Sequence, residues 1–169
     1  MHVRDLPNKE LIKEVRFGVD FGWTNPTALV VVAYDGDGRV WVLDEFYKSQ
    51  VGVKELIGVS KAFILKYGNG EFLCDRSEPQ SIVNLQMAGF RAKDYEFKRE
   101  DGLKELGARF PKAGDGLPRI FIARHCVNLI SELLEYKVEA KERDHAVDAL
   151  RYALKLKPAL PPLRAFRFG

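Results

Sequence analysis

The sequence is poor in cysteine and histidine and has no long apolar run. It contains two cysteines, Cys74 and Cys126, and three histidines among 169 residues. The two cysteines lie in apolar surroundings without the spacing of a metal site, so we predict reduced core residues of a cytosolic protein. No apolar run approaches the roughly 18 residues of a membrane span, and no signal peptide pattern is present at the start. These absences predict a protein without a disulfide framework and without a membrane partner.

The overall composition is ordinary for a globular domain. Hydrophobic residues make up 46% of the chain and charged residues 30%, and neither value points to disorder or to a fibrous protein. A chain of this length suits one domain that buries roughly 70% of its unfolded surface. The net charge of +3 permits a polyanionic partner without requiring one.

Three successive apolar segments predict three strands near the start of the domain. They span residues 16–22 (RFGVDFG), 27–34 (TALVVVAY) and 40–47 (VWVLDEFY), and their β-branched content is typical of buried strands. The DGDG sequence at 35–38 predicts a tight hairpin, because Gly and Asp tolerate positive φ. Asp20 stands inside the first strand. Since an unpaired buried charge is costly, we expect Asp20 to be paired, hydrogen-bonded or bound to a metal.

The rest of the chain predicts alternating helices and strands. Apolar residues recur at helical spacing over 53–67, 101–110, 127–136 and 144–157, whereas short runs at 71–75, 95–98 and 119–123 predict strands. An S-x-x-Q capping box at 77–80 predicts a further helix that ends at Gly89. We divide the chain into a linker or domain boundary at 1–14, an α/β domain at 15–157 and an extended tail at 158–169.

Three acidic positions come together in this scheme. Asp75 ends a strand just before a helix, at the sheet edge where open α/β folds bind ligands. Asp148 lies beside the apolar stripe of the last helix, and Asp144 and His145 share its helical face. With Asp20, these carboxylates supply the oxygen ligands that Mg²⁺ and Mn²⁺ prefer, and without a cation they would repel one another. Two ions about 3.5–4 Å apart would activate a water and stabilise the leaving oxygen of a phosphodiester.

Each of these residues also has a purely structural interpretation. Asp20 could cap a turn, and Asp75 and Asp144 could cap helices. His145 could be an ordinary first-turn histidine, and Asp148 could lie on a solvated helix face. The sequence alone leaves both interpretations open.

A group of basic residues lies close to the second acidic position. Arg76 follows Asp75 directly, and Lys93, Lys98 and Arg99 come after the second predicted helix. These side chains form either a solvated patch or a surface that faces the phosphates of a nucleic acid.

Four segments together form a recognisable pattern. They are residues 17–22 (FGVDFG) followed by 26–28 (PTA), residues 75–79 (DRSEP), residues 128–136, and residues 145–152 (HAVDALRY). This pattern resembles the nuclease domain of the large terminase subunit of tailed bacteriophages, and the resemblance covers residues 15 to about 156. The DxSEP and HAxDAxRY motifs are specific, whereas DxG alone is weak.

The resemblance implies a ribonuclease H-like fold, with a five-stranded mixed sheet flanked by helices. It implies a metal-dependent endonuclease that uses two Mg²⁺ or Mn²⁺ ions to cut concatemeric viral DNA in the host cytoplasm. Matched by motif, the catalytic metal-binding acids are Asp20, Asp75 and Asp148. His145 matches a position that is a metal-site histidine in some members, and members differ at Asp144. The implied partners are double-stranded DNA, the packaging ATPase domain of the same full-length protein, the small terminase subunit and the portal.

The sequence departs from the family pattern in one respect. No G-x-x-x-x-G-K-[ST] loop occurs in it, so we attribute neither ATP hydrolysis nor DNA translocation to this chain. We expect it to be an isolated domain.

Three other classes of protein remain as alternatives. Residues 20–24 (DFGWT) resemble the first phosphate loop of actin-like and sugar-kinase-like nucleotide-binding proteins, which need two such halves. A Holliday-junction resolvase shares the fold and the acids, and a DNA-binding or docking domain could keep the fold without catalysis. Metal-dependent cleavage of duplex DNA would separate the terminase nuclease from all three.

Overall fold

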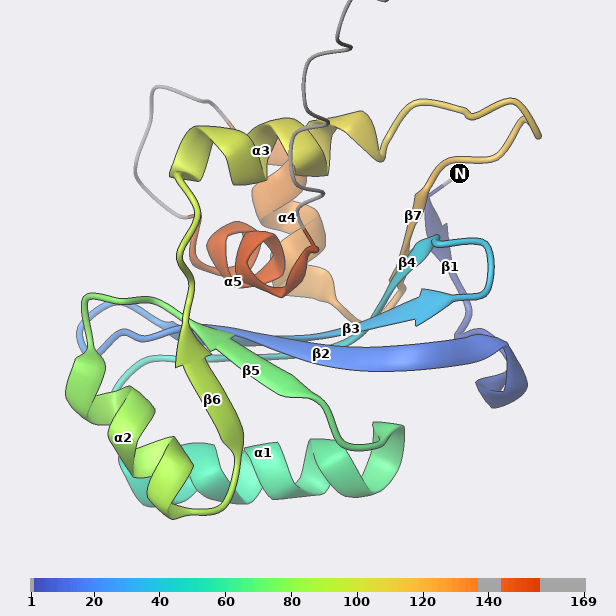
Figure 1. Cartoon of the computed structure of the whole chain (residues 1–169). Helices are drawn as coiled ribbons and strands as arrows, with labels where there is room; N and C mark the ends of the chain where they lie inside the picture. Colours follow the sequence, from blue (N-terminus) through green and yellow to red (C-terminus); the bar gives the residue numbers. More distant parts are fainter. Residues whose placement is uncertain (1, 137–143, 156–169) are drawn as a thin grey trace, which may run out of the picture.

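A seven-stranded mixed sheet runs through the molecule in the computed structural model, which describes residues 2–136 and 144–155 (Figure 1). The strand order is β1-β7-β4-β3-β2-β5-β6. The strands are β1 (Val3–Arg4), β2 (Ile12–Asp20), β3 (Thr27–Asp35), β4 (Val40–Lys48), β5 (Glu71–Cys74), β6 (Arg91–Asp94) and β7 (Ile120–Ala123). The α/β class and the mixed sheet are as predicted, but the sheet has seven strands in place of the expected five.

Helices cover both faces of this sheet. α3, α4 and α5 lie on one face, and α1 and α2 lie on the other (Figure 1). The helices are α1 (Val53–Tyr67), α2 (Pro79–Met87), α3 (Arg99–Ala108), α4 (Val127–Glu135) and α5 (His145–Ala153), and a short 3-10 helix, η1 (Lys9–Leu11), precedes β2. The predicted helix over 53–67 is confirmed along its whole length.

The central hairpins explain why three apolar segments follow one another in the sequence. β2, β3 and β4 pair antiparallel in sequence order. Along β3, Val30 and Val32 pack under α4 and α5, while Leu29 and Val31 pack over α1 and α2. Because both faces are buried, β3 is apolar throughout instead of alternating with polar residues.

The turn between β3 and β4 has the predicted chemistry. The Asp35 carboxylate accepts hydrogen bonds from the backbone N–H groups of Asp37 and Arg39, each at 2.9 Å. Gly38 has a φ of +73°, a conformation that favours glycine. The tight hairpin at 35–38 is therefore confirmed.

The remaining strands are parallel and bring distant chain segments to the same sheet edge. β5 pairs parallel with β2, and β6 pairs parallel with β5. On the other side β7 pairs parallel with β4, and β1 with β7. The carboxyl ends of β2 and β5 therefore lie side by side, which places Asp20 next to Asp75.

A glycine in β2 lets the last helix approach the sheet. A Cβ atom on Gly18 would lie 1.7 Å from the backbone oxygen of Ala149 in α5, so only glycine fits at this point. Gly18 and Asp20 are two residues apart on one strand and therefore face the same side. The close contact at Gly18 brings α5 directly against the Asp20 side chain.

Several sequence-based boundaries need correction. The segment at 1–14, interpreted as a linker, contributes β1 and the first residues of β2, because β1 pairs with β7, a strand more than a hundred residues away. The strand expected at 95–98 lies instead at Arg91–Asp94, where parallel pairing with β5 supplies its hydrogen bonds. The last helix ends at Ala153 and not at 157. The domain boundaries themselves stay a prediction, and the tail at 158–169 lies outside the described residues.

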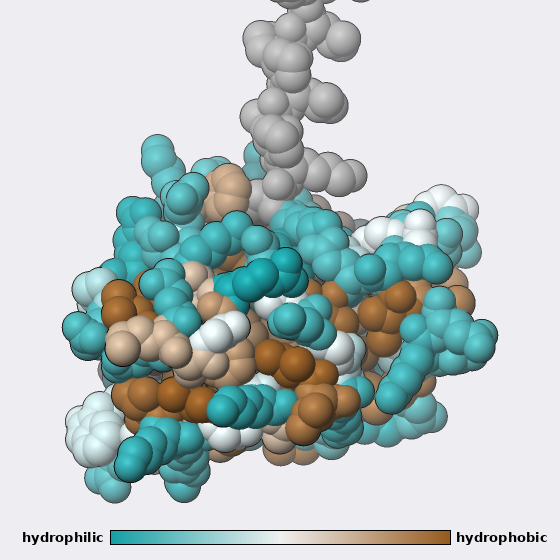
Figure 2. Space-filling view, turned by 60° about the horizontal axis from the view of Figure 1, so that its bottom comes forward, coloured by the Kyte–Doolittle hydropathy of each residue, from teal (hydrophilic) through white to brown (hydrophobic). Residues whose placement is uncertain are grey.

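The outer face over α1 and α2 mixes polar and apolar side chains. Figure 2 shows hydrophobic residues interrupted by hydrophilic ones on the face that this view brings forward. Exposed large apolar side chains on these two helices are Val53, Leu65, Val83 and Met87. Within the described ranges, none of the helices has the length and apolar character needed to cross a membrane.

Candidate active site

Asp20 is a buried carboxylate at the end of β2. Only 7% of the residue is exposed, and its Oδ2 lies 2.8 Å from Nδ1 of His145 in α5. Burial raises the pKa of Asp20 to about 6, the contact with His145 opposes this rise, and the charges of Asp148 and Asp75 add to it. The predicted pairing of Asp20 is confirmed, and its partner comes from a helix 125 residues further along the chain.

Asp75 lies beside Asp20 because its backbone joins the end of β2. Its N–H donates to the carbonyl oxygen of Val19 at 3.0 Å. Its carboxylate accepts hydrogen bonds from the backbone N–H of Ser77, at 3.1 Å, and from the Ser77 hydroxyl. Ser77 therefore orients Asp75 and does not cap α2, whose N-cap is Glu78. The capping box predicted at 77–80 is wrong, since the serine hydroxyl has a nearer carboxylate partner.

The third acid, Asp148, contacts two arginines. Its Oδ1 accepts hydrogen bonds from Nε and Nη2 of Arg151, both at 3.0 Å, and lies 3.8 Å from Nε of Arg99. Arg151 is only 3% exposed, so this pair sits largely out of water. Asp148 is not the solvated helix residue of the structural interpretation.

Asp144 precedes α5 but does not cap it. Its side chain makes no capping hydrogen bond, and its carboxylate instead accepts a hydrogen bond from Nη2 of Arg99. Asp144 and Asp148 thus share Arg99 as a partner, which agrees with the prediction that they occupy one helical face.

The cap of α5 is a residue that the sequence analysis did not assign, Glu132 of α4. Its Oε2 accepts hydrogen bonds from the backbone N–H groups of Ala146 and Val147, at 2.8 and 3.0 Å. Its Oε1 accepts one from the Tyr47 hydroxyl at 2.7 Å. Burial raises the pKa of Glu132, and these three hydrogen bonds oppose that rise. An acidic residue inside the apolar run of a helix was the available signal, because such a carboxylate needs partners.

Tyr152 is a second residue that the sequence analysis did not assign to the site. Its pKa is raised by burial and by the charges of Asp20, Asp148 and Asp75. One tyrosine therefore feels all three acids, which places them around a common region of the molecule.

The four predicted basic residues do not form one patch. Arg76 lies 3.4 Å from Asp94, and Lys93 lies 3.2 Å from Glu71, with all four side chains exposed. Lys98 is the exposed N-cap residue of α3. Arg99 points into the acidic site, where it pairs with Asp144.

The donor set fits Mg²⁺ or Mn²⁺, although the ligands do not yet surround a common point. Within the residues that the structure describes, no three His, Cys, Asp or Glu side chains form a group that could hold a metal ion. Each acid is instead bonded to a protein group: Asp20 to His145, Asp75 to Ser77, and Asp148 to Arg151. Burial disfavours the charge of Asp20, and the nearby carboxylates disfavour it further. A divalent cation at this point would relieve that repulsion.

The sequence matches no protein-family model and no curated protein. Solved structures do resemble it. The nuclease domain of the large terminase of bacteriophage SPP1, with bound Mn, has a TM-score of 0.69 at 21% identity, over 89% of this chain and 93% of that one. The nuclease domain of the P22 large terminase also has a TM-score of 0.69 at 21% identity, over 86% of this chain and 87% of that one.

This chain has the fold of a large terminase nuclease domain. The predicted ribonuclease H-like fold is thus confirmed. A complete large terminase from a thermophilic bacteriophage has a TM-score of 0.76 at 20% identity, over 89% of this chain. The chain spans only 40% of the length of that terminase. Large terminase nucleases of the thermophilic phage G20c with this fold were solved with bound zinc and with bound magnesium.

Proposed function

We propose that this chain is the metal-dependent endonuclease domain of a phage DNA-packaging terminase, acting on double-stranded DNA. The observation that carries the proposal is the convergence of Asp20, Asp75 and Asp148, from two adjacent strand ends and one helix, around buried Asp20. Metal-bound nuclease domains with the same fold support it.

The three acids would hold two Mg²⁺ or Mn²⁺ ions, with His145 as a further ligand. Two such bound ions supply an activated water and stabilisation of the leaving oxygen of the phosphodiester. The protein contributes rigid placement: Gly18 seats α5 against β2, Ser77 orients Asp75, and Arg151 orients Asp148. No protein nucleophile or zinc-type cysteine cluster is needed for this chemistry.

The larger assembly follows from the full-length neighbour. The thermophilic phage terminase was solved with ADP and with ATP-γ-S, and this chain corresponds to less than half of it. We propose that a packaging ATPase domain, a small terminase subunit and a portal are partners of this domain in the host cytoplasm. The ATPase domain would hold DNA against the site, so the nuclease domain alone need not bind DNA tightly.

The test is plasmid cleavage with Mn²⁺ or Mg²⁺, with and without EDTA. We expect cutting only with a divalent ion. Asp20→Asn, Asp75→Asn and Asp148→Asn should each lower the rate at least about 100-fold, since each removes a charged metal ligand. His145→Ala should lower it less. Asp37→Asn is the matched control, because Asp37 is exposed in the β3–β4 turn at the opposite end of the sheet.

The outcomes separate the proposal from its alternatives. Cutting that EDTA does not reduce would contradict a metal-dependent nuclease. Cleavage of four-way junctions with no cleavage of linear duplex would favour a resolvase. ATP binding without cleavage would favour the actin-like class, and DNA binding without cleavage would favour a docking domain.

A further inference from the structure

Arg99 carries a positive charge into the acidic site from a different helix. It is the first residue of α3, whereas the acids it contacts belong to α5 and the residue before it. Its Nη2 donates to Asp144, and its Nε lies 3.8 Å from Asp148. The Asp144 and Asp148 side chains are 12% and 17% exposed, so water screens these contacts only weakly.

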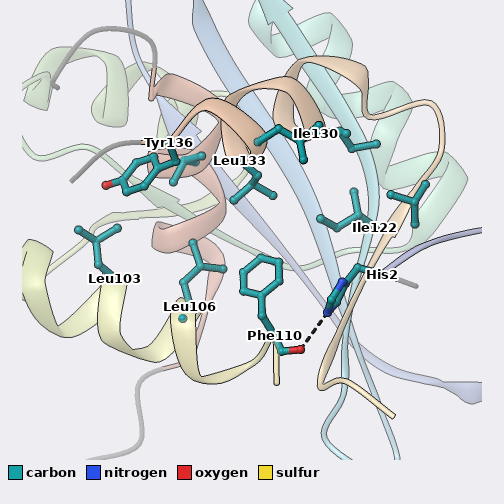
Figure 3. Close-up of a pocket in the computed structure, with 12 residues that line it drawn as sticks. His2, Leu103, Leu106, Phe110, Ile122, Ile130, Leu133 and Tyr136 are labelled. Atoms are coloured by element: carbon teal, nitrogen blue, oxygen red, sulfur yellow. Dashed lines mark hydrogen bonds between the residues drawn. The ribbon is translucent and has the colours of Figure 1, made fainter. Parts of the chain in front are cut away.

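A tyrosine holds the same guanidinium from the other side. The Tyr136 hydroxyl lies 3.3 Å from Nη2 of Arg99. Tyr136 also lines an apolar pocket of about 580 Å³ between α3, α4 and β7. In Figure 3 the Tyr136 ring lies at one end of this pocket, with its hydroxyl directed away from His2 and Ile122 at the other end. The pocket is lined mostly by leucines and other apolar side chains, which accept no hydrogen bonds from a guanidinium.

Arg99 and Arg151 are differently placed. Arg151 is almost completely buried and belongs to the same helix as Asp148. The Arg99 side chain is 31% exposed, so it can move into water at little cost. Between these two arginines, Arg99 is therefore the one that a competing cation could displace from Asp148.

We propose that Arg99 is an internal counter-ion that competes with a divalent cation for Asp144 and Asp148. Its single positive charge compensates both acids when no metal is bound. A divalent ion that binds these carboxylates must break the contacts of Arg99, so the arginine lowers the metal affinity of this part of the site. The inference rests on the proposed function only in requiring that the domain binds Mg²⁺ or Mn²⁺.

The experiment is calorimetric titration of the metal-free domain with Mn²⁺, without DNA. Breaking a charge-assisted hydrogen bond opposes binding, so Arg99→Gln should tighten the weaker Mn²⁺ site by about tenfold. Arg99→Lys keeps the charge and should stay near the parent. Tyr136→Phe loosens Arg99 without removing it and should tighten the site by about two- to threefold. Arg91→Gln, an exposed arginine on β6, is the control.

Thermal unfolding gives a second readout. Added Mn²⁺ should raise the melting temperature of Arg99→Gln more than that of the parent, because the ion then replaces a missing counter-charge. Unchanged or weaker Mn²⁺ binding in both Arg99→Gln and Tyr136→Phe would overturn the inference. A lysine variant that binds as tightly as the glutamine variant would also overturn it. Absence of Mn²⁺ binding in the parent would instead refute the proposed function.

Discussion

At the scale of single residues, Asp20 concentrates the conflict between burial and charge. It is 7% exposed, and its negative charge adds to those of Asp75 and Asp148. His145 relieves part of this conflict, and its own pKa is raised by the hydrogen bond to Asp20. Removal of the Asp20 charge should therefore stabilise the metal-free fold even though it disables the proposed activity.

The pH dependence of stability tests this conflict. The pKa of Asp20 rises from 3.8 to about 6 on folding, so the folded state binds its proton more tightly than the unfolded state. This contribution to stability is complete below about pH 4 and is lost as the pH rises through 6. His145 acts in the same direction at higher pH, because its pKa is also raised in the folded state.

We therefore expect Asp20→Asn to be more stable than the parent at pH 7.5 in EDTA, by about 1–3 kcal/mol. The difference should shrink toward pH 4.5. Denaturant unfolding at the two pH values measures it, with Asp37→Asn as control. An asparagine variant that is less stable by the same amount at both pH values would show that the Asp20 carboxylate is well compensated in the fold.

At the scale of secondary structure, the position of α5 decides whether the site exists. Gly18 allows close approach to β2, and Glu132 of α4 caps the amino end of α5. Since His145 and Asp148 lie in the first turns of this helix, a shift at its amino end moves both residues. The docking of α4 against α5 is therefore part of the site architecture.

Glu132→Ala tests this role of α4. The change leaves the backbone N–H groups of Ala146 and Val147 without their buried acceptor, which should cost about 2–4 kcal/mol. For a domain of this size, that corresponds to a fall in melting temperature of roughly 5–15 °C. Glu135→Ala is the matched control, since Glu135 is an exposed residue of the same helix. An equal effect of both changes would mean that general helix stability, and not the cap, is responsible.

At the scale of the whole molecule, charge is spread without a strong basic surface. The net charge is +3, and Arg76 and Lys93 are each close to an acidic side chain. Long-range attraction for DNA is therefore small. The domain should bind DNA weakly and with marked salt dependence, and in the proposed assembly an attached motor would raise the local DNA concentration.

Charge reversal tests which face meets DNA. We expect Arg76→Glu combined with Lys98→Glu to raise the DNA concentration needed for half-maximal cleavage. The slope of log affinity against log salt should fall by about 0.9 for each phosphate that the variant no longer neutralises. Lys112→Glu is the control, because Lys112 is exposed in the α3–β7 connection. If the double reversal leaves both quantities unchanged, DNA approaches by another face.

Much of the fold follows from local pattern. The three central strands, their hairpin and α1 were predicted because burial periodicity and turn chemistry act between residues close in the chain. The three acids were also identified from sequence, since each stands where an apolar element would otherwise continue. β1 was missed because two residues carry no periodicity, and the position of β6 depends on pairing with β5.

Only the tertiary structure decided which groups partner these acids. Asp20 bonds to His145 across 125 residues, and Arg99 bonds to Asp144 across 45. Ser77 bonds to a carboxylate instead of capping the helix that its motif predicted, and Glu132 caps a helix other than its own. A sequence pattern records which side chains will be buried, because burial follows local periodicity. It does not record which polar groups then meet, because that depends on how whole helices dock on the sheet, and at α5 the docking is set by the missing side chain of Gly18.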